Sequence, residues 1–189
     1  MTRKERQAYR PLVNGGLSRS GIQIAIYTLA LLIVGILTGA VVSVLLLDSA
    51  LMGTGAFYTE YKQLQIRALI VFLPVLGGAA IMLSSAYLYL IWHHRPARWL
   101  TSAAIVCFVL ASFVTFRLHF PLNVQIMSWS VQIPPDQWMH VQEQWWQAHV
   151  VRTGAILCGF ILLLLNSWMP NSPNRISAAG FAGSIEAVT

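Results

Sequence analysis

Charged residues are scarce in this sequence. Asp, Glu, Lys and Arg make up 10% of the 189 residues, whereas a soluble domain carries about 25%. Only six residues are acidic, and 57% of the chain is hydrophobic. This composition excludes an ordinary soluble domain and predicts an integral membrane protein whose first partner is the lipid bilayer.

Cysteine is rare and the common catalytic motifs are missing. The two cysteines, Cys107 and Cys158, lie within apolar runs and have no Cys or His at metal-binding spacing beside them. The sequence contains no Walker loop and no GxGxxG, GxSxG, HExxH or CxxCH motif. Hydrolase, kinase, nicotinamide-dependent and c-type haem functions therefore have no support in the sequence.

The basic residues gather in a few places. Five of the twelve Lys and Arg residues lie within residues 1–20, and two more lie in the turn His93–Arg98. Lys and Arg concentrate on the cytoplasmic side of membrane proteins. The pattern therefore indicates that these basic residues mark the cytoplasmic side and do not bind nucleic acid, so we predict no nucleic-acid partner. Both termini are then cytoplasmic, and we expect the protein in the bacterial cytoplasmic (inner) membrane.

Four apolar runs are long enough to cross a bilayer, for which about 20 residues suffice. They cover residues 22–47, 68–92, 99–120 and 149–169. We predict an all-α, integral membrane four-helix bundle over residues 21–170, between a basic tail at 1–20 and a flexible tail at 171–189. Pro74 predicts a kink within the second run, and residues 48–67 are expected to form a short external connection.

A stripe of polar and aromatic residues leads into the fourth run. Pro134-Pro135-Asp136 is typical of a helix start, and an extracytoplasmic amphipathic helix that begins there can continue into the fourth span. Spacings of four, three, four and three residues then place one set of side chains on the same helix face. They are Trp138, Gln142, Trp145, His149 and Arg152. We expect this face to point into the bundle or a cavity rather than to lipid.

The histidines of this region have three interpretations. His119 ends the third run and His149 begins the fourth, so the two can approach each other. They are interfacial residues without a special role, or one of them is a general base. Alternatively they bind haem or copper, with Met127, Met139 and His140 as further ligands.

The arginines and tryptophans also leave alternatives open. Arg117 and Arg152 lie near the boundary of apolar runs, where an unpaired guanidinium is costly. They reach the lipid headgroups or pair with one of the few carboxylates, or they stabilise an anionic ligand. Trp138 and Trp145 stack on a flat aromatic ligand, or they anchor the chain at the membrane interface.

Three short motifs resemble a known family. Phe120-Pro121-Leu122-Asn123 follows the third run, Trp145 stands in the helix after it, and Val151-Arg152-Thr153 opens the fourth run. Together they resemble the anthrone-oxygenase-like family of small four-helix membrane proteins. The resemblance implies a four-helix bundle and, for some members, oxidation of anthrones to anthraquinones without a cofactor.

The resemblance also implies roles for individual residues. His149 or His119 would remove a proton from a flat phenolic substrate, and Arg152 and Asn123 would stabilise the anion that forms. Trp138, Gln142, Trp145 and Arg117 would bind the substrate. No metal or other cofactor is predicted for this chemistry. The alternatives are a non-catalytic subunit of a larger membrane complex, a homo-oligomer, or a subunit that binds haem or quinone.

Overall fold

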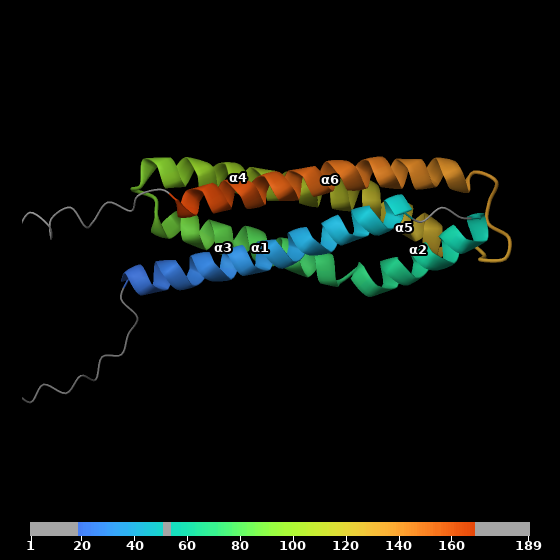
Figure 1. Cartoon of the computed structure of the whole chain (residues 1–189), viewed down its shortest axis with the longest axis horizontal. Coiled ribbons are helices and arrows are strands. Elements are labelled where there is room, and N and C mark those ends of the chain that lie inside the picture. Colours follow the sequence, from blue (N-terminus) through green and yellow to red (C-terminus); the bar gives the residue numbers. More distant parts are fainter. Residues whose placement is uncertain (1–18, 51–53, 169–189) are drawn as a thin grey trace, which may run out of the picture.

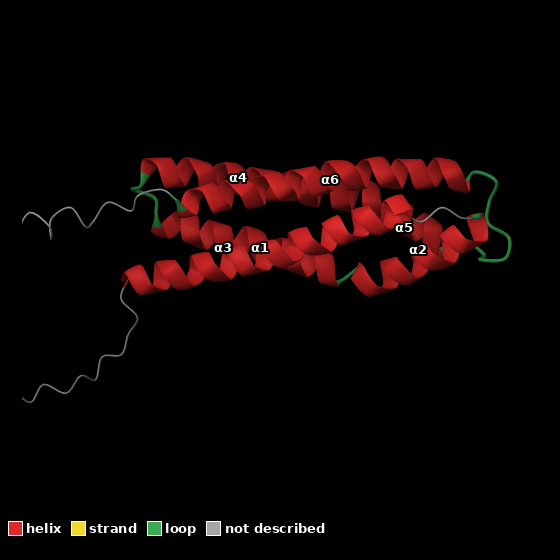
Figure 2. Ribbon diagram, in the orientation of Figure 1, coloured by secondary structure: helices red, strands yellow, loops and turns green. Residues whose placement is uncertain are grey.

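The computed structural model describes residues 19–50 and 54–168, and within them every regular element is helical (Figure 2). The all-α prediction is therefore confirmed for the described residues. Of the predicted tail at 1–20, residues 1–18 lie outside the described residues and the last two belong to the first helix; the predicted tail at 171–189 lies wholly outside them. In chain order the elements are α1 (Arg19–Ala50), α2 (Gly55–Leu69), α3 (Phe72–Leu90), α4 (Arg95–Val114), the π-helix η1 (Thr115–His119), α5 (Phe120–Met127) and α6 (Trp138–Ser167).

Four helical stretches are long and apolar enough to cross a membrane: Ser20–Ala50, Phe72–Leu90, Arg95–Met127 and Trp138–Ser167. Many large apolar side chains on them face outward, for example Leu32, Met82, Val106 and Ile161, as expected for helices surrounded by lipid. The predicted integral membrane bundle is confirmed at this level.

The four long helices run antiparallel along one axis (Figure 1). α1 packs against α3 and α6, and α4 packs against the same two helices, so the four form a closed ring. The buried centre of the ring contains mainly aliphatic side chains around Phe108. Gly159 of α6 packs directly against the phenyl ring of Phe108. A Cβ at this position would lie only 2.4 Å from Phe108 Cε1, so the close packing requires glycine. α2 and α5 extend the bundle at one end (Figure 1).

The second span begins later than predicted, because residues 48–67 are not a simple connection. α2 occupies much of this segment and begins after Thr54, whose side chain accepts a hydrogen bond from the backbone N–H of Phe57. The helix is then interrupted by a turn at Ile70 and Val71, and α3 begins after it. The proline ring of Pro74 clashes with the carbonyl four residues earlier in a continuous helix, which explains a break at Ile70. The interruption predicted from Pro74 therefore separates two helices instead of kinking one.

The third span is longer than predicted and contains an irregular turn. The backbone N–H of Phe120 bonds to the carbonyl of Thr115, five residues earlier, which defines the π-helix η1. Pro121 follows directly and has no N–H to offer to the carbonyl of Arg117. The wider turn accommodates the proline and sets the direction of the side chain of His119, which is buried.

The amphipathic helix predicted before the fourth span is continuous with it. α6 runs without a break from Trp138 to Ser167. It begins a few residues after the predicted start, because Asp136 and Gln137 form a turn in which the Trp138 N–H bonds to the carbonyl of Pro135. The helix therefore links the loop end of the bundle directly to its membrane-spanning part.

Candidate functional site

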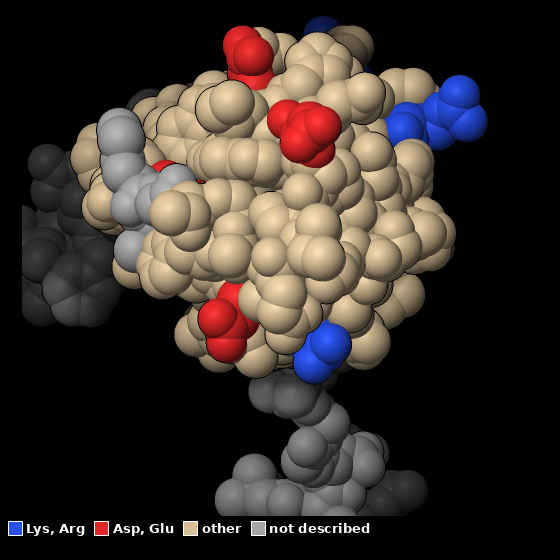
Figure 3. All heavy atoms as spheres, turned by 90° about the vertical axis from the view of Figure 1, so that its right-hand side faces the viewer, with Lys and Arg blue, Asp and Glu red and all other residues tan. Residues whose placement is uncertain are grey.

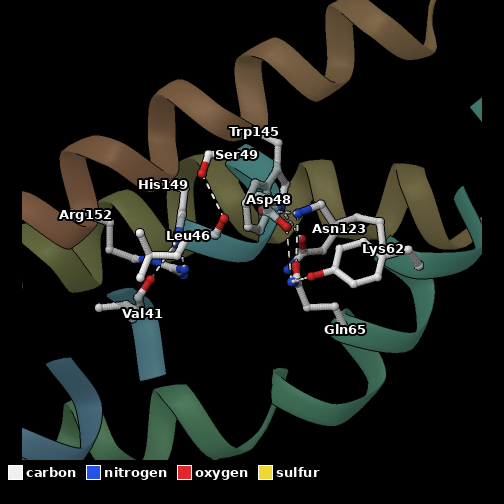
Figure 4. A network of polar contacts seen from close by, with 11 residues as sticks. Val41, Leu46, Asp48, Ser49, Lys62, Gln65, Asn123, Trp145, His149 and Arg152 are labelled. Carbon is white, nitrogen blue, oxygen red and sulfur yellow. Dashed lines mark hydrogen bonds and ion pairs between the residues drawn. The ribbon is translucent and has the colours of Figure 1, made fainter. Parts of the chain in front are cut away.

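Buried polar side chains converge at the end of the bundle where α2 and α5 pack (Figure 4). Lys62 comes from α2, His119 from η1, and Trp145, His149 and Arg152 from α6. All five are buried, and Lys62, His119 and His149 are at most 2% exposed. Burying polar groups is costly unless they are paired, so such a concentration calls for an explanation beyond packing.

Trp145 is the centre of this cluster. Its indole N–H donates a 2.9 Å hydrogen bond to Asn123 Oδ1. The ammonium nitrogen of Lys62 lies 3.4 Å from the ring centroid, a close cation–π contact. The ring of His149 stacks at 4.9 Å and that of His119 meets it edge-on at 5.0 Å. These contacts fix the position of the indole and, through it, that of Asn123.

His149 is fully engaged by its neighbours. Its Nε2 lies 3.1 Å from the carbonyl oxygen of Val41, so this nitrogen carries the proton and donates it. Its Nδ1 accepts a 2.7 Å hydrogen bond from Arg152 Nη2. With both ring nitrogens occupied, His149 ties α6 to α1 and orients Arg152 (Figure 4).

His119 is in the opposite situation. It is 1% exposed, and neither ring nitrogen has a hydrogen-bond partner. Its ring contacts are with Trp145 and with His149, whose ring lies 5.9 Å away. The Nε of Arg152 is likewise buried without a partner. Unpaired buried groups of this kind are uncommon in folded proteins and suggest a site that a ligand completes.

The lysine that lies over the Trp145 ring belongs to a buried ion pair. Lys62 Nζ lies 2.5 Å from Asp48 Oδ2 and donates to Gln65 Oε1 at 2.9 Å. Loss of contact with water lowers the pKa of Lys62 to about 8, although the Asp48 carboxylate opposes this shift. Tyr61 joins the network, since its hydroxyl accepts a hydrogen bond from Gln65. Burial also raises the pKa of Tyr61.

Trp145 lines two pockets. The outer pocket has a volume of about 450 Å³ and is lined by the ion pair and by aromatic side chains that include Tyr58, Trp138 and Trp146. Gln142 contributes an amide to the same wall. A volume of this size is within the range of small-molecule sites. The outer pocket therefore holds the aromatic half of the predicted stripe.

The inner pocket shares Trp145 with the outer pocket and measures about 210 Å³. His119, Asn123 and Arg152 line it together with Trp145, and most of the remaining wall is aliphatic. The amide nitrogen of Asn123 is free to donate here, because its oxygen is taken by the Trp145 indole. The inner pocket thus combines a free imidazole, a guanidinium and an amide in an apolar enclosure.

The structure separates the predicted site residues into groups. Asn123, His119, Arg152 and Trp145 line the inner pocket, and Trp138 and Gln142 line the outer one with Trp145. His149 braces Arg152 from behind. Arg117 does not join them: its side chain is exposed on η1 and lines neither pocket.

The residues named as further metal ligands are dispersed. Met139 and His140 are exposed at the start of α6, and His140 contacts Gln144. Met127 packs against an apolar cluster formed by Val44, Ile66, Ile126, Val141 and Trp145. Among residues 19–50 and 54–168, no group of three or more His, Cys, Asp or Glu side chains is arranged to hold a metal ion.

Sequence reasoning missed Lys62 and Gln65 as site residues and did not pair Lys62 with Asp48. A signal was present, since Tyr58, Tyr61, Lys62 and Gln65 recur at helical spacings of three and four residues. Thr54, a favoured helix-capping residue, stands at the start of that helix.

The comparisons with known proteins give one match. A family model described as anthrone oxygenase matches residues 68–162, half of the chain. No curated protein and no solved structure matches the chain. The matched range contains His119, Asn123, Trp145 and Arg152, whereas Asp48 and Lys62 lie outside it.

Proposed function

The chain belongs to the anthrone oxygenase family, and on this premise we propose that it is an integral membrane oxygenase that uses O₂ to oxidise a flat phenolic or anthrone-type substrate in the inner pocket. The observation that carries the proposal is the buried, unpartnered imidazole of His119 beside the unpartnered Nε of Arg152. A base and a fixed cation that face one enclosed space suit the removal of a proton and the stabilisation of the resulting anion.

His119 is the base in this proposal, in place of His149. Both nitrogens of His149 are bound, by Val41 and by Arg152. Neither ring nitrogen of His119 has a hydrogen-bond partner, and the residue lines the inner pocket. It accepts a proton from the methylene carbon that lies opposite the carbonyl in the central ring, and the bonding electrons move through the conjugated rings onto the carbonyl oxygen to give a planar, aromatic anion.

Arg152 and Asn123 stabilise that anion. The Nε–H of Arg152 and the amide N–H groups of Asn123 are donors at the wall of the same pocket. Donors that are already fixed in an apolar pocket stabilise developing charge without reorganising. His149 holds the guanidinium in place from its other side, and Trp145 does the same for the amide.

The overall reaction balances without an added electron carrier. The anion gives an electron to O₂, and the two resulting radicals combine to form a carbon–oxygen bond and a peroxide. The protonated His119 returns its proton to the peroxide, the O–O bond breaks, and water leaves with the second hydrogen of the carbon. Anthrone and O₂ become anthraquinone and water. The methylene carbon loses four electrons when it becomes a carbonyl carbon, and these reduce O₂ to one carbonyl oxygen and one water oxygen.

We also propose an orientation in the membrane. The His93–Arg98 turn lies between α3 and α4, at the end of the bundle from which α1 starts. The opposite end carries scattered acidic and basic side chains between large uncharged areas (Figure 3). Arg95 and Arg98 in that turn, together with the five Lys and Arg residues among the first twenty of the sequence, support cytoplasmic termini, with the α2–α5 end on the outer side of a bacterial inner membrane. Membrane-impermeant maleimide should then label Ser130→Cys in intact spheroplasts but not Trp92→Cys. Labelling of Trp92→Cys alone would show that the protein has the opposite orientation.

Oxygen uptake by the purified protein in lipid nanodiscs tests the proposed function. With anthrone as substrate we expect consumption of one O₂ per anthraquinone formed, at a rate unchanged by chelators. Arg152→Gln should lose most of this turnover, whereas Arg117→Gln, which alters an exposed arginine near the same end, should retain it. Absence of uptake by the wild type with anthrone and with hydroquinones would refute the oxygenase.

A further inference from the structure

We propose that the substrate of the inner pocket is a membrane-dissolved, apolar molecule that enters sideways from the bilayer through a groove between α3 and α4. This inference rests on the proposed function, because it concerns access to the same pocket. It specifies the substrate class as a flat, lipid-soluble molecule with one oxygen acceptor at its leading edge.

A third pocket provides the route. It measures about 260 Å³ and is lined by all four long helices; α3 contributes Gly77 and Gly78, and α4 contributes Phe108 and Ser112. Both helices are long and apolar enough to span a membrane, and Gly78 and Phe116 of the lining are exposed. We therefore place the mouth of the groove beside these two residues, at the depth of the lipid chains. Its wall is almost entirely apolar, and the hydroxyl of Ser112 is already bonded to the carbonyl of Phe108.

The groove leads to the site. Five residues line both the groove and the inner pocket, so the two spaces adjoin: Leu73, Pro74, Thr115, Phe116 and Arg152. Thr115 is bonded to the carbonyl of Ala111, and Arg152 is the charged residue at the junction. The side chain of Arg152 is 6% exposed and its Nε has no partner.

This arrangement indicates the chemistry of the occupant. An apolar wall favours an apolar body, and the unpartnered Nε–H of Arg152 at the inner end calls for a hydrogen-bond acceptor. A lipid chain entering with its methyl end would fill the groove but leave this donor unpaired. A ring system with a carbonyl or phenolic oxygen at its leading edge satisfies both parts of the route.

Two glycines keep the groove open. A Cβ added at Gly77 or at Gly78 would meet no atom within 4 Å, so a side chain can begin there in open space. Helix interiors normally disfavour glycine, and substitution should therefore leave the fold intact. Gly39 of α1 is a matched control, because it has the same free space and lines none of the three pockets.

The test measures how fast a flat phenol reaches the site. We would follow binding of 2-naphthol to the full chain in nanodiscs by stopped-flow fluorescence, which does not depend on reaction with O₂. For Gly77→Leu and Gly78→Leu, we expect association and dissociation rates to fall by about tenfold with Kd changed by less than about threefold, because passage past an added leucine has an overpacking cost. Gly39→Leu should behave like the wild type.

A second control separates this route from entry through the outer pocket. Met139→Trp fills the outer pocket, which Met139 lines from an exposed position, and should leave both rates unchanged. Slowing by Met139→Trp in place of the glycine variants would overturn the lateral route, as would wild-type rates in both glycine variants or a lack of saturable binding by the wild type. If binding follows the prediction but no variant consumes O₂ with anthrone, the route stands and the proposed oxygenase fails.

Discussion

His119→Phe should reduce oxygen-dependent turnover of anthrone by about 100-fold or more, since a positioned general base contributes about 10²–10⁴ to a rate. Phenylalanine retains a ring that can meet Trp145 edge-on, as His119 does, and it removes two buried nitrogens that have no partner. The variant should therefore fold at least as well as the wild type. The measurement is the initial rate of anthraquinone formation, together with the thermal unfolding temperature.

His140→Phe is the matched control for this variant. His140 is exposed on the first turn of α6 and contacts Gln144 rather than the pocket. We expect its turnover to equal that of the wild type. If His119→Phe retains full turnover while remaining folded, His119 is not the base.

Lys62→Met should destabilise the protein by about 3–5 kcal/mol, the usual effect of removing one member of a buried ion pair. The carboxylate of Asp48 would remain buried, with the side-chain amide of Gln65 as a hydrogen-bond donor 3.3 Å away. The indole of Trp145 would also lose the cation above its ring. Chemical unfolding in detergent measures the loss, and Arg67→Met, which removes an exposed cation from the same helix, should change stability by less than about 0.5 kcal/mol.

The double variant Lys62→Met/Asp48→Leu tests whether the loss of stability comes from the unpaired Asp48 carboxylate or from the change of side chain at Lys62. Because an apolar replacement avoids the cost of burying both charges, we expect it to recover most of the lost stability. A double variant as unstable as Lys62→Met alone would show that the ion pair is not the cause.

The pH dependence of stability gives an independent check on Lys62. Its pKa is about 8 in the folded protein, against 10.5 as the ordinary value. Between these two values the unfolded chain holds a proton that the folded protein lacks, so the free energy of unfolding should rise with pH. Lys62→Met should lack this rise.

Much of the α6 half of the site is predictable from the sequence. The recurrence of Trp145, His149 and Arg152 at spacings of four and three residues requires only helix geometry, and the helix forms without a break. Asn123 was linked to Trp145 through the family motifs, and the structure joins them by a hydrogen bond. What the motifs could not show is that the indole lines two pockets.

The α2 half is harder to predict, for two physical reasons. The first is that the segment of α2 has the polar composition of a loop, although it forms a helix that buries Tyr58, Lys62 and Ile66. The pairing of Lys62 with Asp48 also depends on how α2 folds back on α1, which no local pattern specifies. Likewise, the difference between His119 and His149 is decided by partners from other helices, above all by the carbonyl of Val41.

Anaerobic hydrogen exchange is the most direct test of the central claim, which is that His119 removes a proton from a substrate held in the inner pocket. Anthrone would be incubated with the protein in D₂O without O₂, and deuterium at its methylene carbon would be followed by mass spectrometry. The account predicts that the wild type and His140→Phe accelerate this exchange and that His119→Phe does not. Equal acceleration by His119→Phe, or no acceleration by the wild type, would contradict it.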